Sequence, residues 1–197
     1  MIDFAQYFKG HSLAESSELN ELLNQVKLVN VKRGEVLQHR GDDAKHAYFV
    51  RSGLLRSFSV DEKGKEHVFM FAPEGWIISD IQSTAMQSPA VLSIDALEDT
   101  VVEVIRADIF EELVNTHMGS HPDFAGLELN RLLRRIAVLQ KRVLLLLSAS
   151  ATERYQEFIT TYPNLQQRVS QRLIASYLGI TPEALSRIRV ELIKSER

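Results

Sequence analysis

The sequence predicts an α+β protein: an N-terminal antiparallel β-roll of the jelly-roll barrel type, one long helix, and a C-terminal helix-turn-helix. Three patterns favour this fold. Short alternating runs are separated by glycine turns, apolar residues follow a strict heptad, and two short helical stripes meet at Gly179. We therefore expect three parts, over residues 1–120, 121–150 and 151–197.

The first part is rich in strand patterns. A short helix is expected over 16–25, with Ser17 as its N-cap. Strands are expected over 27–31, 35–39, 46–51, 54–60, 66–71, 91–96 and 100–105. Short strands with glycine-marked turns at intervals of about 8–12 residues are typical of a jelly roll or barrel. We assign four aromatic residues to the barrel core, with lining of a pocket as the alternative: Tyr48, Phe49, Phe71 and Trp76.

The second part is helical. One helix is expected from Asp108 to about His117, and a longer one over 123–148. Apolar residues recur in the long helix at steps of three and four, at Leu129, Leu132, Ile136, Leu139, Val143 and Leu146. This heptad seam favours pairing with another helix, in the same chain or in a second copy. Further leucines at 133, 144, 145 and 147 indicate that the helix also packs on its own chain, and simple coverage of the barrel is the alternative.

The third part begins with a helix over 152–159, for which we expect Thr152 as the cap. The next helix has an inward stripe at Leu173, Ile174, Tyr177 and Leu178. Gly179 then ends it, because a helix commonly ends at a residue with positive φ. Ile180 is expected to fill the angle between this helix and the following one.

The last helix has a clear start signal. Thr181 is a good N-cap, Pro182 suits the first helical position, and Glu183 suits the positive end of the helix. Its inward residues are Leu185, Ile188 and Leu192, and its outward residues include Ser186, Arg187 and Arg189. This layout predicts a helix-turn-helix, which places one helix in the major groove of DNA. An ordinary helical hairpin is the alternative.

Composition excludes several classes of protein. The net charge of −3 divides into −5 over residues 1–150 and +2 over 151–197, so the basic excess lies with the helix-turn-helix. There is no cysteine, which excludes disulfides, iron–sulfur clusters and zinc held by cysteine. No apolar run is long enough to span a membrane, and the first residues lack a signal-peptide pattern, so we expect a cytoplasmic protein.

No enzyme chemistry is evident in the chain. The six histidines form no His-x-His pair, and no catalytic triad, paired carboxylates or glycine-rich phosphate loop is present. We therefore expect no catalytic residue, no metal site and no cofactor, although haem ligation by one of the histidines stays open.

The order of barrel, long helix and helix-turn-helix resembles the Crp/Fnr family, named for the cyclic-AMP receptor protein and the fumarate–nitrate regulator. Matching segments are 32–37, 41–42, 48–53, 55–56, 71–75 and 174–188. The resemblance implies a transcriptional regulator that is not an enzyme and dimerises through the long helix. Its expected partners are double-stranded DNA with a twofold-symmetric operator, RNA polymerase for an activator, and an effector bound in the barrel.

The resemblance also assigns roles to residues near the C-terminus. It makes Glu183 and Arg187 the base readers, because Glu accepts from the cytosine amino group and Arg forks onto guanine. Thr181, Ser186 and Arg189 are further DNA-binding candidates, and Arg172 joins Thr181 as a phosphate contact. The sequence ends at Arg197 without the β-hairpin wing that often follows, so we expect weaker backbone contacts.

The effector region departs from the family pattern. Cyclic-nucleotide binders have a Gly-Glu pair and then Arg-Ser or Arg-Thr, whereas this chain has Ser79-Asp80 and Pro89-Ala90, and residues 76–105 contain no Lys or Arg. Burying a phosphate without a cation is costly. We therefore expect an effector other than cyclic AMP or cyclic GMP, or none, and Asp80 is alternatively a helix cap. A ligand or protein-interaction module that has lost DNA binding is the alternative function, and a barrel enzyme is a more distant one.

Overall fold

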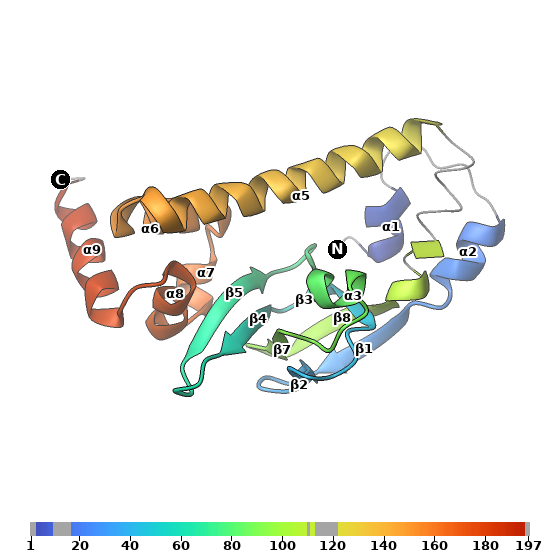
Figure 1. The fold of residues 1–197 in the computed structure, drawn as a ribbon, viewed down its shortest axis with the longest axis horizontal. Coiled ribbons are helices and arrows are strands. Elements are labelled where there is room, and N and C mark those ends of the chain that lie inside the picture. The colour runs from blue at the N-terminus through green and yellow to red at the C-terminus, as the bar shows by residue number, and fades with distance from the viewer. Residues whose placement is uncertain (1–2, 10–16, 110, 113–121, 196–197) are drawn as a thin grey trace.

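The N-terminal domain is a roll of two antiparallel sheets (Figure 1). The computed structural model describes residues 3–9, 17–109, 111–112 and 122–195. The first sheet has the order β1-β8-β3-β6 and the second has the order β2-β7-β4-β5. Their bounds are Lys27–Val31 (β1), Val36–Gln38 (β2), His46–Ser52 (β3), Leu55–Val60 (β4), Glu66–Ala72 (β5), Ile77–Ser79 (β6), Ser93–Ala96 (β7) and Thr100–Arg106 (β8).

Every strand predicted from the sequence is present, with ends shifted by up to two residues. Four short elements of the described chain were not predicted: the helix α1 (Phe4–Lys9), the strand β6, the helix α3 (Ile81–Ala85) that follows it, and the helix α7 (Leu165–Arg168). Each is too short to show a periodic apolar pattern. The α+β class and the roll are confirmed.

The space between the two sheets is filled by apolar side chains from both, including Tyr48, Val50, Leu55, Ile94 and Val102. Neighbouring residues on a strand point to opposite faces. Phe49 therefore points outward, where it packs with Phe4 of helix α1 (Phe4–Lys9) and with residues of helix α2 (Ser17–Leu23). Tyr48 is in the barrel core as predicted, whereas the prediction for Phe49 was wrong.

The C-terminal helices pack beside strand β5, the edge strand of the second sheet (Figure 1). These are α6 (Ala151–Thr161), α7 (Leu165–Arg168), α8 (Gln171–Leu178) and α9 (Pro182–Ser195). Phe71 points outward from β5 and lies 5.9 Å from Tyr162, measured between ring centroids. Trp76 lies 5.4 Å from the same ring. Phe71 therefore belongs to the contact with the C-terminal helices, which corrects its assignment to the barrel core. Trp76 packs against both this contact and the barrel core.

Helix α5 (Pro122–Ser148) runs along the molecule above the roll and leads into α6 (Figure 1). Its 27 residues match the predicted range to within one residue and span about 40 Å. The cap of α6 was predicted at Thr152 but is Ser150, which forms a capping box with Glu153. Helix α2 begins at Ser17, whose side chain lies outside the described residues, as does most of the helix expected over 108–117.

Candidate nucleic-acid interface

Helices α8 and α9 meet in a tight turn, as predicted. Gly179 ends α8 in the left-handed conformation with φ of 68°, and its N–H donates to the carbonyls of Ala175 and Ser176. Ile180 is partly buried against the core shared by the two helices, and its N–H donates to the Ala175 carbonyl at 3.0 Å. These bonds satisfy carbonyls that a helix end leaves unpaired. The turn therefore fixes the direction in which α9 leaves α8.

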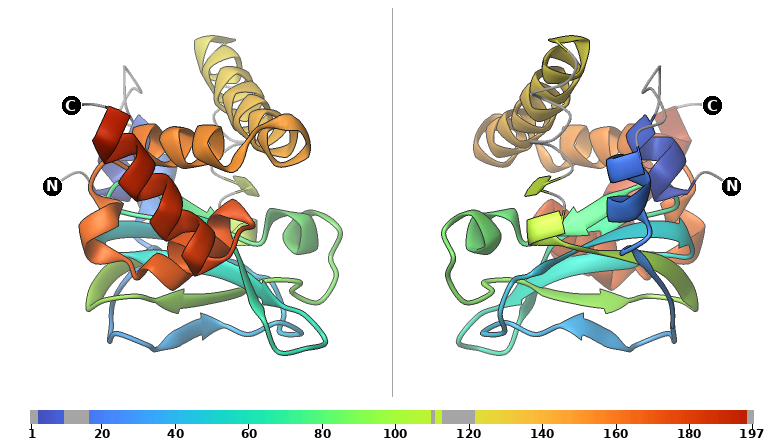
Figure 2. Two further views of the ribbon diagram at one scale, coloured as in Figure 1. Left: turned by 90° about the vertical axis from the view of Figure 1, so that its left-hand side faces the viewer. Right: turned by 90° about the vertical axis from the view of Figure 1, so that its right-hand side faces the viewer.

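Helix α9 begins with the predicted cap. The Thr181 hydroxyl accepts a hydrogen bond from the backbone N–H of Ala184 at 3.2 Å. Leu185 and Ile188 are buried against α6 and α8. Viewed from this end of the molecule, α9 is the outermost element (Figure 2, left). The helix thus presents one whole side away from the protein.

The predicted DNA-binding residues fall into two groups by exposure. Thr181, Glu183, Ser186 and Arg187 are exposed on the outward side of α9 and its N-terminus, and Arg172 is exposed at the start of α8. Arg189 is half-buried and close enough to Tyr155 of α6 to affect its pKa. At about 100° per residue it lies roughly 65° from the mean direction of the inward residues of α9, so its assignment to the outward side was wrong. The structure brings these residues to one end of the molecule, on the two helices of the motif.

Glu183 is held in its ionised form. Hydrogen bonds from its own backbone N–H and from the Thr181 hydroxyl, with Arg187 nearby, lower the pKa of its carboxyl. An ionised carboxylate only accepts hydrogen bonds. The N-terminal turn of α9 therefore offers an acceptor at Glu183 beside a cationic donor at Arg187.

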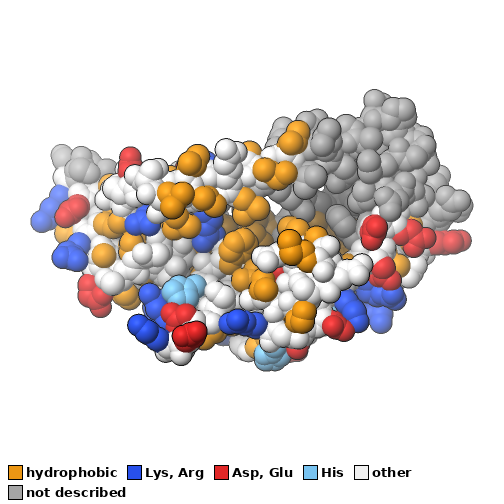
Figure 3. All heavy atoms as spheres, viewed as in Figure 1, with side chains coloured by type: hydrophobic (Ala, Val, Ile, Leu, Met, Phe, Trp, Pro, Cys, Tyr) orange, Lys and Arg blue, Asp and Glu red, His pale blue; other side chains and the backbone are white. Residues whose placement is uncertain are grey.

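The apolar seam of α5 is exposed in the single chain (Figure 3). Ile136, Leu139, Val143 and Leu146 each leave more than two fifths of their surface in solvent. Leu129 and Leu132 lie in the helix, but their side chains are outside the described residues. An exposed apolar stripe of this length is typical of an interaction surface.

Ser176 of α8 joins the helix-turn-helix to the free edge of β5. Its hydroxyl accepts from the Val68 N–H at 3.0 Å and donates to the Glu66 carbonyl at 2.7 Å. An edge strand has unpaired backbone groups that need partners. The Ser176 hydroxyl therefore occupies two backbone groups of β5 that a further strand would otherwise bond.

Arg142 of the long helix α5 also binds the backbone of β5 at this edge. Its guanidinium donates to the carbonyls of Val68, Phe69 and Tyr177. It also lies over the Tyr177 ring, 4.0 Å from the centroid. The Arg142 guanidinium therefore links the long helix α5 to both the barrel edge and the helix-turn-helix. Nothing in the sequence pattern indicated this role for Arg142.

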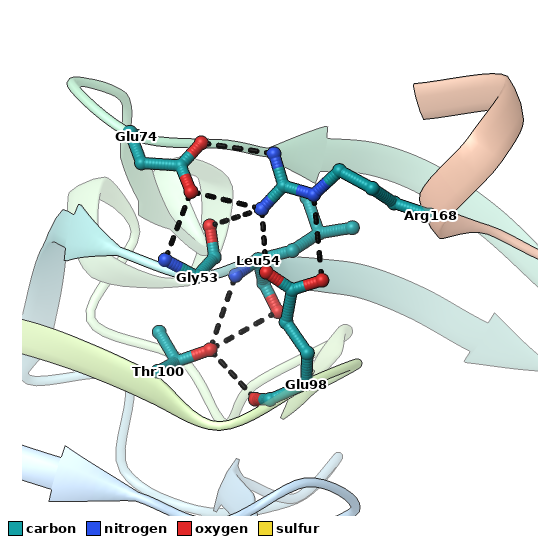
Figure 4. A network of polar contacts seen from close by, with 6 residues as sticks. All are labelled: Gly53, Leu54, Glu74, Glu98, Thr100 and Arg168. Carbon is teal, nitrogen blue, oxygen red and sulfur yellow. Dashed lines mark hydrogen bonds and ion pairs between the residues drawn. The ribbon is translucent and has the colours of Figure 1, made fainter. Parts of the chain in front are cut away.

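Arg168 of α7 forms a second polar link between the C-terminal helices and the roll, in addition to that of Arg142 (Figure 4). We call this link the Arg168 anchor. Nη1 and Nη2 of Arg168 bond to Glu74, both at 2.9 Å, and Nη2 lies 2.6 Å from Oε1 of Glu98. Nη2 also donates to the Gly53 carbonyl at 3.0 Å, and the Gly53 N–H donates to Glu74. The carboxylates of Glu98 and Glu74 raise the pKa of Arg168. One side chain thus binds three turns of the barrel.

Gly53 is required at this anchor. Its φ is 94°, a region that side chains disfavour, and a Cβ there would lie 2.5 Å from Oγ1 of Thr100. The same Thr100 oxygen accepts from the Leu54 N–H at 3.1 Å. The turn that Arg168 contacts is therefore also held by contacts within the barrel itself.

Asp80, a candidate effector residue, is buried and fully engaged within the protein. It caps α3 by accepting from the Ser83 N–H at 3.2 Å. Its other oxygen accepts from the N–H groups of Val91 and Leu92, at 2.7 and 2.9 Å. The carboxylate thereby holds the loop that contains Pro89 and Ala90. Ser79 is half-buried, Pro89 is exposed and Ala90 is buried.

Two further features concern only the part of the chain that the structure describes. No three His, Asp or Glu side chains there come together as ligands for a metal ion. No helix among those residues is long and apolar enough to cross a membrane.

Known proteins are similar to this chain both in the barrel and over most of its full length. Residues 28–117 match the cyclic nucleotide-binding domain family. The anaerobic regulatory protein of Haemophilus influenzae is 30% identical over 186 residues, covering 87% of this chain and 69% of that protein. The fumarate and nitrate reduction regulatory protein of Vibrio cholerae is 28% identical, covering 93% of this chain and 74% of that protein.

Solved structures confirm the fold. FixK2 from Bradyrhizobium japonicum superposes with a TM-score of 0.67 at 19% identity, over 87% of this chain and 86% of that one. A regulator of the Crp/Fnr family from Eubacterium rectale also gives 0.67 at 19% identity, over 91% and 85%. Both superpositions extend beyond the barrel into the helical C-terminal region.

Proposed function

Because the chain belongs to the Crp/Fnr family of transcriptional regulators, we propose that two copies bind a twofold-symmetric operator, each through the outward side of α9. Residues 1–120 serve as the sensor domain, 121–150 as the dimerisation helix and 151–197 as the DNA-binding domain. The regulator acts in the cytoplasm. RNA polymerase is the next partner if transcription is activated.

The observation that carries this proposal is the exposure of Glu183, Ser186 and Arg187 on one side of α9. Glu183 accepts from a cytosine amino group, and Arg187 donates to guanine O6 and N7. Thr181 and Arg172 contact phosphates, and the half-buried Arg189 supports them from the flank. Base readers on one helix face, with phosphate contacts around them, match how such motifs recognise DNA.

The second copy covers the seam of α5. Ile136, Leu139, Val143 and Leu146 pair with their counterparts, and Leu129 and Leu132 extend the seam. A twofold axis along this helix presents the two α9 helices to half-sites about 34–36 Å apart, one turn of DNA. Dimer formation and operator symmetry thus depend on the same helix.

The effector region does not bind a cyclic nucleotide. The Asp80 carboxylate already takes the N–H groups of α3 and of the 91–92 segment, and no Lys or Arg lies between 76 and 105. An incoming phosphate would meet a buried carboxylate in place of a cation, which is costly. Calorimetry with cyclic AMP and cyclic GMP tests this, and micromolar binding of either would overturn it.

DNA binding is tested by a salt titration on a pool of duplexes. Binding through Lys and Arg contacts to phosphates weakens steeply as salt rises. Arg187→Ala is expected to cost about 1–3 kcal/mol and to relax the preference at one base pair per half-site, whereas Arg172→Ala weakens all duplexes alike. An equal loss on every sequence for Arg187→Ala would remove it from the base readers.

A further inference from the structure

Val190 stands out on α9 because it is apolar and half exposed on the side of the helix that faces away from the core. Its exposed fraction is 50%. At about 100° per residue, Val190 lies roughly 165° from the mean direction of the inward residues Leu185, Ile188 and Leu192. A valine in that direction does not contribute to the core of its own domain.

The position of Val190 continues the line of the proposed base readers. Glu183, Ser186, Arg187 and Val190 are spaced as i, i+3, i+4 and i+7, so they share one helix face. The same spacing is used by the helix with which homeodomains read the major groove. The valine therefore extends the reading face by one turn toward the C-terminus of α9.

The neighbours of Val190 favour DNA over an apolar protein partner. Arg187 lies one turn before it and Lys194 one turn after it, and both are exposed. An apolar side chain flanked by two cations along one helix face suits a groove whose rim carries phosphates. The apolar group on the floor of the major groove is the 5-methyl group of thymine.

We propose that Val190 contacts the 5-methyl group of one thymine in each operator half-site, which adds a hydrophobic reader to the polar ones. This inference depends on the proposed function, because it requires α9 to enter the major groove. Three residues advance a helix by about 4.5 Å, and base pairs are stacked about 3.4 Å apart. The thymine therefore lies one or two base pairs from the guanine that Arg187 reads.

The test replaces thymine by deoxyuridine, which removes only the methyl group, at each thymine of an operator obtained by unbiased selection. With the wild-type protein, one thymine per half-site should show a loss of about 3- to 5-fold in affinity, and of about 10- to 20-fold when both half-sites are changed. Val190→Ser should bind the thymine and deoxyuridine duplexes equally at that position.

Ile193 supplies the matched control, because it is 57% exposed on the same helix but lies roughly 105° from the inward direction. Ile193→Ser should keep the wild-type preference for thymine, and circular dichroism should show both variants folded. The inference is overturned if the wild-type protein senses no methyl group, or if Val190→Ser keeps the full preference. Failure to select any duplex would instead overturn the proposed function, and the inference with it.

Discussion

The Nη2 atom of Arg168 lies 2.6 Å from Oε1 of Glu98, across the boundary between the C-terminal helices and the barrel. The same guanidinium binds Glu74, so it neutralises carboxylates from two turns that would otherwise face each other unpaired. Beside this polar anchor, Phe71 and Leu54 share an apolar cluster with Tyr162 and Phe158. The C-terminal helices, including the one proposed to read DNA, are therefore held on the barrel by packing and charge together.

Loss of this anchor should destabilise the protein. Arg168→Ala leaves two carboxylates without a cation and is predicted to lower the free energy of unfolding by about 1–2 kcal/mol, a range that allows for their partial exposure. Urea unfolding measures this change. Lys32→Ala removes an exposed ion pair with the neighbouring Asp99 and should cause no measurable change. Equal stability of the Arg168→Ala variant and the wild type would show that the anchor contributes nothing.

Acid should weaken the same contact. Burial raises the pKa of Glu74, but hydrogen bonds from Arg168 and Gly53 outweigh it, so the pKa lies below the ordinary 4.5. A carboxyl with a lowered pKa stabilises the fold above its unfolded pKa, and this contribution is lost as pH falls through the folded pKa. Stability should therefore drop from about pH 5 downward, and less steeply in Glu74→Gln. Parallel pH profiles for wild type and variant would contradict the assignment.

The barrel and the C-terminal helices should unfold together, because one apolar cluster spans both. Trp76 is the single tryptophan and packs on Tyr162, so its fluorescence reports on the contact, while far-ultraviolet circular dichroism reports mainly on the helices. The two unfolding curves should coincide in the wild type. Phe71→Ala should cost about 3–5 kcal/mol and separate the curves. Coincident curves in the variant would argue against a shared core.

The proposed dimer is expected to depend on the α5 seam. Leu139→Asp together with Val143→Asp should give a monomer in sedimentation experiments, because charged groups at seam positions cannot be buried without partners. Ala137→Asp places the same charge on an exposed position outside the seam and should leave the dimer intact. A dimer that survives the double substitution would place the interface elsewhere.

Local patterns predicted the local structure well. Gly179 and Thr181 were identified because a helix end and a helix start each have their own residue preferences. Asp80 was considered as a cap, and it caps α3. The face to which Phe71 points was predicted wrongly. Both faces of a strand can be apolar when one packs in the barrel and the other packs on a helix, and the sequence then does not indicate which face is the barrel interior.

The contacts that position the C-terminal helices on the barrel could not be predicted from spacing. Arg168 and Glu98 are 70 residues apart in the sequence, and Ser176 and Glu66 are 110 apart. Arg142 likewise bonds to Val68, Phe69 and Tyr177, all far from it in the sequence. Such contacts arise when folded elements pack together, and no short sequence window contains both partners.

The most direct test of DNA recognition is selection of bound sequences from a random duplex library by the full chain. The account predicts an enriched pair of inverted half-sites whose centres lie about 10 base pairs apart, each with a base pair whose preference disappears in Arg187→Ala. A library that yields no enriched sequence, or an enriched site without twofold symmetry, would contradict it.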